Sequence, residues 1–146
     1  QKIAAIRDRW KGKLVIKGIV SEEDAEAAIR QGIDGIIVSN HGGRQLDAGP
    51  SSIKVLGRIV ENYQDKIRIM MDSGLRSGPD VARALASGAE FTFLGRNFMY
   101  AVAALGAEGA NHMIRSLTIQ LKQVMEQIAC IKVDDLKNHL VKKGEY

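Results

Sequence analysis

A histidine and an arginine flank two glycines at the end of an apolar segment. Residues 38–45 read VSNHGGRQ, which places His41 and Arg44 three residues apart. A neutral imidazole can accept a proton near neutral pH, and a guanidinium can bind a carboxylate through two parallel hydrogen bonds. Alone, each residue would be an ordinary structural histidine or a surface charge. Together they suit a substrate that carries a carboxylate beside the group that loses a proton.

A lysine interrupts the first apolar segment, LVIKGI (14–19). A charged ammonium group within a strand requires an anionic partner or a shifted pKa. Alternatively, Lys17 extends from the strand end into water. Lys17 is therefore a second candidate site residue.

Glycine-rich turns follow two later apolar segments. One reads DSGLRSG (72–78), and the other joins Gly95 to Arg96. Exposed backbone N–H groups, a helix start at Ser77 and nearby arginines are typical of phosphate sites. Either turn alone could be an ordinary loop with a solvated arginine.

The other chemically distinctive residues do not suggest a further site. We interpret His112, His139 and Cys130, which lie in or near helical patterns, as structural. A single cysteine excludes an internal disulfide and a cysteine-based metal cluster. No His, Asp or Glu set has the spacing of metal ligands. We therefore predict no metal site, and a reducing, cytosolic compartment.

Four short apolar segments alternate with helical patterns and must position these residues. Such segments are typical of strands covered on both faces in a parallel sheet. Ser21 and Ser77 have the pattern of helix N-caps, and Gly32 and Gly88 that of helix ends. The expected strands are 14–19, 34–40, 67–74 and 91–95. The expected helices are 1–12, 21–32, 50–63, 77–88, 98–105, 109–129 and 133–143.

This alternation predicts a parallel α/β sheet with right-handed crossovers. An open, flavodoxin-like sheet would carry its phosphate loop after the first strand, but residues 17–22 (KGIVSE) match neither glycine fingerprint. The glycine turns instead follow the third and fourth strands, as in the phosphate loops after strands seven and eight of a barrel. We predict the last four βα units of a (β/α)8 TIM barrel plus C-terminal helices. The expected divisions are a leading helix (1–12), four βα units (13–96) and the final helices (97–146).

Composition excludes several classes of protein. The chain is 45% hydrophobic and 26% charged, as expected of a globular domain. Its net charge of +4 is modest and its aromatic content is 5%, which argues against nucleic-acid binding. The first ten residues, QKIAAIRDRW, lack both a signal-peptide pattern and an initiator methionine. We therefore expect the chain to begin within a longer protein.

The motifs VIKG, IIVSNHGGRQLD, MDSGLRSGPDV and FLGR together resemble the C-terminal half of the FMN-dependent 2-hydroxy-acid dehydrogenases and oxidases. This family includes L-lactate dehydrogenase, glycolate oxidase and lactate oxidase, and the resemblance covers about residues 13–106. It implies an eight-stranded barrel with FMN at its C-terminal face. It also implies oxidation of an L-2-hydroxy acid, such as L-lactate or glycolate, to the 2-oxo acid.

The resemblance implies a role for each matching residue. His41 would be the catalytic base, and Arg44 would bind the substrate carboxylate. Lys17 would stabilise the reduced flavin at its N1/O2 edge, and Ser39 would hydrogen-bond the flavin. The ribityl chain and phosphate would be held by Asp72, Ser73, Gly74, Arg76, Gly95 and Arg96.

Two departures from the family pattern affect this interpretation. The family loop usually reads D-G-G-x-R, whereas Ser73 stands at the middle glycine here, which requires a negative φ to be tolerated without strain. In addition, the first four strands, with the substrate-binding tyrosines and the carboxylate that orients the histidine, are not in this sequence.

We therefore expect this chain alone to be inactive and to need the N-terminal half of the same barrel. The resemblance further implies a homo-oligomer, such as a tetramer, in the cytoplasm or peripheral at the membrane face. Two alternatives remain: another FMN-binding barrel, such as an isomerase or a nucleotide dehydrogenase, and a non-catalytic half-barrel that associates through its sheet edges.

Overall fold

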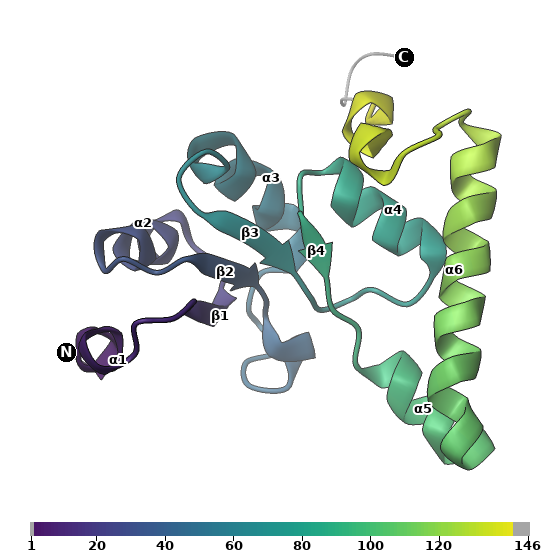
Figure 1. Cartoon of the computed structure of the whole chain (residues 1–146), viewed down its shortest axis with the longest axis horizontal. Coiled ribbons are helices and arrows are strands. Elements are labelled where there is room, and N and C mark those ends of the chain that lie inside the picture. Colours follow the sequence, from purple (N-terminus) through teal and green to yellow (C-terminus); the bar gives the residue numbers. More distant parts are fainter. Residues whose placement is uncertain (1, 142–146) are drawn as a thin grey trace. The chain divides into compact units, whose positions relative to one another are not determined.

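The computed structural model of the chain is an α/β structure, and it describes residues 2–141 (Figure 1). Its contacts divide the chain into two compact units. The sheet unit comprises Gln1–Gly74 and Gly88–Phe91, and the helical unit comprises Leu75–Ser87 and Thr92–Tyr146.

The strands follow one another in the order β1-β2-β3-β4, as expected of consecutive βα units. β1 pairs with β2, and β2 with β3, in parallel. Their bounds are Val15–Ile19 (β1), Gly35–Val38 (β2), Arg68–Met71 (β3) and Phe91–Thr92 (β4). All four predicted strands are confirmed, but the predicted bounds of β2, β3 and β4 were too long. β2 ends at Val38 because a tight turn begins at Asn40.

Two helices cover one face of the sheet in the sheet unit. This unit contains α1 (Lys2–Arg9), α2 (Glu22–Arg30) and α3 (Ser52–Tyr63). The Oγ atom of Ser21 accepts a hydrogen bond from the Asp24 N–H group at 3.1 Å, which confirms the predicted N-cap of α2. α2 packs against β1, and α3 packs against β2 and β3 (Figure 1). The buried apolar side chains of these helices and strands include Ile19, Ala25, Ala28, Ile36, Val38, Val55, Leu56, Ile59, Ile69 and Met71.

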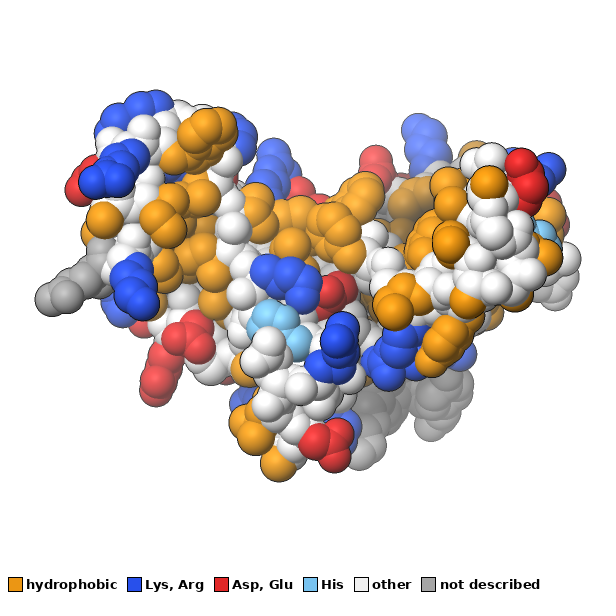
Figure 2. All heavy atoms as spheres, turned by 90° about the horizontal axis from the view of Figure 1, so that it is seen from below, with side chains coloured by type: hydrophobic (Ala, Val, Ile, Leu, Met, Phe, Trp, Pro, Cys, Tyr) orange, Lys and Arg blue, Asp and Glu red, His pale blue; other side chains and the backbone are white. Residues whose placement is uncertain are grey.

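The sheet unit also exposes apolar side chains, notably around its edge strand β1. Val15 is 43% exposed and Trp10, which precedes the strand, is 56% exposed. Figure 2 shows hydrophobic side chains at the surface among charged ones. An edge strand with exposed apolar side chains is a surface that proteins usually cover with further chain.

In the helical unit, α4 and α5 both pack against the long helix α6. The bounds are Gly78–Ala86 (α4), Arg96–Leu105 (α5) and Gly109–Gln127 (α6). Ser77 accepts a hydrogen bond from the Asp80 N–H group, which confirms the predicted N-cap of α4. A β-carbon on Gly78 would lie 2.5 Å from Cβ of Gln120, so only glycine permits this approach of α4 to α6. No helix within residues 2–141 is long and apolar enough to span a membrane.

The end of the described chain differs from the predicted helix at 133–143. Residues Val133–His139 form a 3-10 helix, and positions 142–143 lie outside the described residues. Val, Asp and Asn are poor residues for an α-helix interior. Leu136 packs with Ala82 and Cys130 in a small core.

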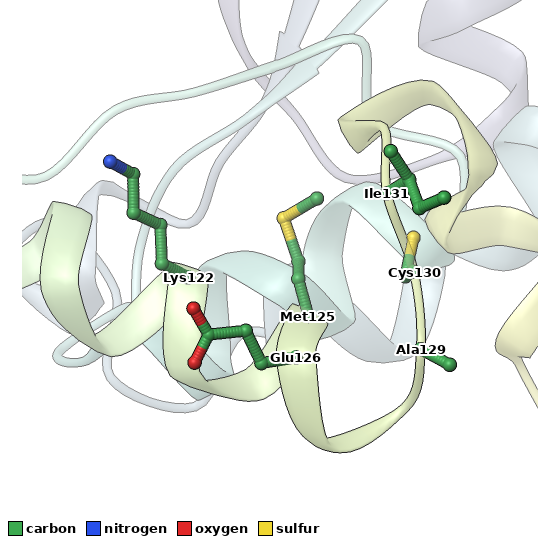
Figure 3. Close-up of a pocket in the computed structure, with 6 residues that line it drawn as sticks. All are labelled: Lys122, Met125, Glu126, Ala129, Cys130 and Ile131. Carbon is green, nitrogen blue, oxygen red and sulfur yellow. The ribbon is translucent and has the colours of Figure 1, made fainter.

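A hollow of about 440 Å³ near the end of α6 is lined by Lys122, Met125, Glu126, Ala129, Cys130 and Ile131 (Figure 3).

Asp34 ties α1 and the start of β1 to the loop before β2. Its carboxylate accepts hydrogen bonds from Lys13 Nζ at 2.8 Å, from the Leu14 N–H group at 2.9 Å and from Arg7 Nη1 at 3.0 Å. These bonds, the one from Lys13 foremost, lower the pKa of Asp34 from 3.8 to about 2. The charged form of Asp34 is therefore favoured by folding.

We predict that Asp34→Asn destabilises the chain in a pH-dependent way. Because the pKa is lower in the folded state, the contribution of Asp34 is present above pH 3.8 and is lost as the pH falls through about 2. Urea unfolding from pH 6 to pH 2 should show a difference between wild type and variant that shrinks toward the acid end. Asp65→Asn, at an exposed position after α3, is the matched control and should show a smaller difference at every pH. Equal effects of the two substitutions would contradict the role of Asp34.

Candidate active site

The carboxyl ends of β1, β2 and β3 bring a lysine, a serine and an aspartate together. Lys17 Nζ lies 3.0 Å from Asp72 Oδ2 and donates a hydrogen bond to Ser39 Oγ at 3.0 Å. The ammonium group therefore has the anionic partner that the sequence required. Its side chain remains 41% exposed, so part of it also faces solvent.

The Asp72 carboxylate is held in its charged form by this cluster. Partial burial acts to raise the pKa of Asp72, but hydrogen bonds from Ser39, Lys17 and Ser73 and the positive charge of Lys17 outweigh it. The net result is a lowered pKa. An ionised Asp72 fixes the ammonium group of Lys17 at the end of the sheet.

The turn after β2 presents the histidine. His41, Gly42 and Gly43 have left-handed backbones, with φ values of 56°, 68° and 73°. Glycine adopts such values without strain, whereas a histidine there is strained and must be held by its surroundings. The Asn40 side chain accepts a hydrogen bond from the Gly42 N–H group at 3.0 Å and donates one to the Pro50 carbonyl at 3.2 Å. The pair of glycines therefore permits a tight turn that leaves His41 exposed.

Ser39 lies beneath this turn and is only 1% exposed. Its Oγ atom accepts hydrogen bonds from the His41 N–H group at 3.1 Å and from Lys17 Nζ at 3.0 Å. The structure thus gives Ser39 a role in holding the turn and the lysine. A direct hydrogen bond from Ser39 to a flavin stays a prediction.

His41 itself lies near the cation. His41 Nδ1 is 3.5 Å from Lys17 Nζ, which places the imidazole at the border of the cluster. Arg44 follows the turn with an exposed side chain. The end of β2 and the turn that follows it therefore present a potential base, His41, and a potential carboxylate-binding group, Arg44, at the surface.

Ser73 differs from expectation, because its φ value is +75° rather than negative. The next residue, Gly74, also has a left-handed φ of 81°. The loop after β3 therefore keeps a left-handed backbone at residues 73 and 74, although Ser73 stands where the family pattern has a glycine. Hydrogen bonds hold it there: Ser73 Oγ donates to Asp72 Oδ1 at 2.8 Å and accepts from the Gly42 N–H group at 3.0 Å.

The arginines of the glycine turns lie in the helical unit. The Asn97 side-chain amide donates a hydrogen bond to the Arg76 carbonyl, which joins the loop before α4 to the first turn of α5. The Arg76 guanidinium lies 6.0 Å from the centre of the Tyr100 ring, within the range of a cation–π contact. The sequence interpretation missed Asn97, which directly follows the predicted Gly95-Arg96 turn, and Tyr100, which lies one helical turn further on.

These groups fit an anion. α5 begins at Arg96 after Gly95, which has no side chain to cap the helix. The first N–H groups of a helix have no partner within the helix and favour negative charge. A β-carbon on Gly95 would meet no atom within 4 Å, which leaves space for a ligand to approach the backbone. The donor set of Arg76, Arg96 and the start of α5 therefore suits a phosphate group.

Gly18 is a site residue that the sequence interpretation missed. It follows Lys17 in β1, where the register with β2 shifts, and its φ is 102°. A β-carbon on Gly18 would lie 2.7 Å from His41 Nε2, which is too close without movement of the ring. The available signal was a glycine inside an apolar strand, which marks a bulge or a close approach.

Comparison with known proteins agrees with this geometry. The family model of the FMN-dependent dehydrogenases matches residues 1–143. The chain belongs to this family. The match confirms the predicted family and its FMN cofactor.

Two enzymes of this family illustrate how similar the chain is to its relatives. An FMN-dependent alpha-hydroxy acid dehydrogenase of Schizosaccharomyces pombe is 42% identical over 96% of this chain and 35% of its own length. An L-lactate dehydrogenase of Vibrio parahaemolyticus is 46% identical over 94% of this chain and 36% of its own length. The chain thus spans about a third of the length of these relatives.

Solved structures show the same relationship. A mandelate oxidase with (S)-2-phenylpropionate matches 92% of this chain and 40% of its own, with a TM-score of 0.88 and 38% identity. A monotopic membrane protein, (S)-mandelate dehydrogenase, matches 92% of this chain and 36% of its own, with a TM-score of 0.88 and 40% identity. The match confirms the predicted fold, in which this chain forms part of a larger barrel.

We predict that Gly18→Ala displaces the His41 ring in this dehydrogenase family member. The new β-carbon would contact Nε2, and alanine is strained at a φ of 102°. The free energy of unfolding should fall by about 1–3 kcal/mol, and a crystal structure should show the ring moved away from Gly18. Gly57→Ala in α3, where a β-carbon would meet nothing within 4 Å, is the control and should not lower stability. An unmoved imidazole and unchanged stability would contradict this assignment of Gly18.

Proposed function

We propose that this chain forms the C-terminal half of the barrel of an FMN-dependent enzyme that oxidises an L-2-hydroxy acid, such as L-lactate or glycolate, to the 2-oxo acid. The observation that carries the proposal is the cluster in which Lys17 joins Asp72 to the turn bearing His41. The names of the relatives, which include L-lactate dehydrogenase and FMN-dependent alpha-hydroxy acid dehydrogenase, support it.

The proposal assigns residues of the chain to both ends of the FMN molecule. Lys17 offers a cation to the flavin edge, and Ser39 supports the lysine from below. The ribityl chain and phosphate would be held by Asp72, Ser73, Gly74, Arg76, Gly95 and Arg96. When bound, FMN supplies the acceptor for the two electrons and the hydrogen that leave carbon 2 of the substrate.

His41 and Arg44 then act on the substrate. Arg44 binds the carboxylate through its guanidinium and thereby orients carbon 2. His41 accepts the proton of the 2-hydroxyl group while the C–H bond at carbon 2 breaks, which yields the 2-oxo acid. The carboxylate that orients the imidazole and the tyrosines that contact the substrate would come from the N-terminal half of the barrel.

This pair of residues distinguishes the proposal from other FMN-binding barrels. An isomerase or a nucleotide dehydrogenase would need the glycine-rich turns that bind the phosphate. It would not need a base and a carboxylate-binding arginine on one turn. The exposure of both His41 and Arg44 at the end of β2 favours a small carboxylate substrate.

We also propose that the protein assembles as a homo-oligomer in the cytoplasm, with peripheral contact at the membrane face. The single thiol, Cys130, is buried and unpaired, as is usual in a reducing compartment. The description of one structural neighbour as a monotopic membrane protein supports the membrane contact.

We predict that His41→Gln in the full-length, FMN-loaded protein slows anaerobic reduction of the flavin by L-lactate or glycolate. Glutamine keeps the size and polarity of the side chain but cannot accept the proton, so the rate should fall by about 10²–10⁴-fold. Stopped-flow loss of the flavin absorbance measures this rate. His112→Gln, which replaces an exposed histidine of α6, is the matched control and should leave the rate unchanged.

Undiminished reduction in the His41→Gln protein would exclude His41 as the base. If the wild-type protein reduces its flavin with none of several L-2-hydroxy acids, the proposed substrate class is wrong.

We further predict that residues 1–146 purified alone do not oxidise hydroxy acids and self-associate. The edge strand β1 and the exposed Val15 and Trp10 side chains would pair with another copy in the absence of the N-terminal half. Light scattering should show oligomers, and co-expression with the N-terminal half should replace them with a mixed complex. A monodisperse monomer that turns over a hydroxy acid would contradict this prediction.

A further inference from the structure

Ser73 is the residue of the cluster that departs from the usual family pattern. Its hydroxyl group donates a hydrogen bond to Asp72 Oδ1 at 2.8 Å and accepts one from the Gly42 N–H group at 3.0 Å. It also lies 3.3 Å from Ser39 Oγ. One hydroxyl group therefore connects the loop after β3 to the turn after β2.

The backbone of Ser73 shows that this connection has a cost. A φ of +75° lies in the left-handed region, where a serine is less stable than a glycine. A glycine would adopt the same loop without strain but would leave the Gly42 N–H group and the Asp72 carboxylate without this common partner. The hydrogen bonds of the hydroxyl group offset the strain.

The contact on Gly42 matters because of its place in the chain. Gly42 lies directly after His41, and the His41 N–H group is itself held by Ser39 Oγ. Two serines that also contact the Lys17–Asp72 pair thus bond to the backbone on both sides of the His41 α-carbon, Ser39 through Lys17 and Ser73 through Asp72. The Gly42 N–H group is shared between Ser73 Oγ and Asn40 Oδ1, each at 3.0 Å.

We propose that Ser73 is a positioning residue, which ties the turn bearing His41 to the Lys17–Asp72 ion pair. The inference rests on the proposed function in so far as His41 is the base. Ser73 acts through the backbone of the turn rather than on the substrate. Loss of its hydroxyl group should loosen the turn and misplace the imidazole, since small errors in the position of a catalytic group slow reactions strongly.

The test compares substitutions that separate the hydroxyl group from the backbone strain. Ser73→Gly removes both, and Ser73→Ala removes only the hydroxyl group. Ala129→Gly is the matched control, because Ala129 also has a left-handed φ, of 53°, and lies outside the cluster. All three are made in the full-length, FMN-loaded protein.

We expect Ser73→Gly and Ser73→Ala to slow flavin reduction about tenfold or more. Amide exchange in peptides covering residues 39–46, measured by mass spectrometry, should speed up about fivefold. Exchange in α3 should not change. Ala129→Gly should change neither quantity. Because Ser73→Ala keeps the strained backbone and Ser73→Gly relieves it, a similar effect of both substitutions assigns the effect to the loss of the hydroxyl group.

A double variant tests whether Ser73 acts through His41. If it does, Ser73→Gly should slow flavin reduction much less in the His41→Gln background than in wild type. An equal slowing in both backgrounds, or Ser73 variants with wild-type rate and exchange, would overturn the proposal. Absence of flavin reduction in the wild-type protein would instead refute the proposed function, and the exchange data would still decide whether Ser73 holds the turn.

Discussion

The Lys17–Asp72 ion pair is the constraint around which the candidate site is organised. The two residues come from the ends of β1 and β3, and Ser39 at the end of β2 contacts Lys17 between them. Because parallel strands end at the same edge of the sheet, three segments distant in sequence meet there without a long loop. Partial burial acts to raise the pKa of Asp72, but hydrogen bonds from two hydroxyl groups and the ammonium group outweigh this effect and lower the pKa. Each member of the cluster therefore depends on the others.

Left-handed backbone is the second requirement of the site. Gly18, His41 and Ser73 all have positive φ values, and they lie on the three segments that Lys17, Ser39 and Asp72 bring together. At Gly18 the conformation and the close His41 ring both require glycine. At His41 and Ser73 the side chain is retained in spite of the strain. A hydrogen bond holds the backbone N–H group of His41, and two hydrogen bonds hold the side-chain hydroxyl group of Ser73. Strained residues that are held in this way are typical of functional sites.

The sequence was informative where the structure is determined by local chemistry. Ser21 and Ser77 cap their helices, the strands occur at the predicted places, and Lys17 has an anionic partner, because each follows from one residue type and its neighbours. The sequence could not show which anion Lys17 contacts, since that depends on the register of three strands. It also could not show that Ser73 keeps a positive φ, because the compensating hydrogen bond reaches a residue 31 positions away.

The polar groups of the site fall into two classes, and the division indicates what the chain supplies. Ser39, Ser73 and Asp72 bond to one another, to Lys17 or to the backbone of the turn, so their positions are fixed within the chain. His41 and Arg44 have exposed side chains at the end of the same turn. A preformed support beneath two exposed functional groups lowers the entropic cost of arranging them around a ligand. The sheet unit therefore fixes the backbone of the turn that carries His41. Under the proposed function, the rest of the barrel would add the groups that orient the imidazole and enclose the substrate.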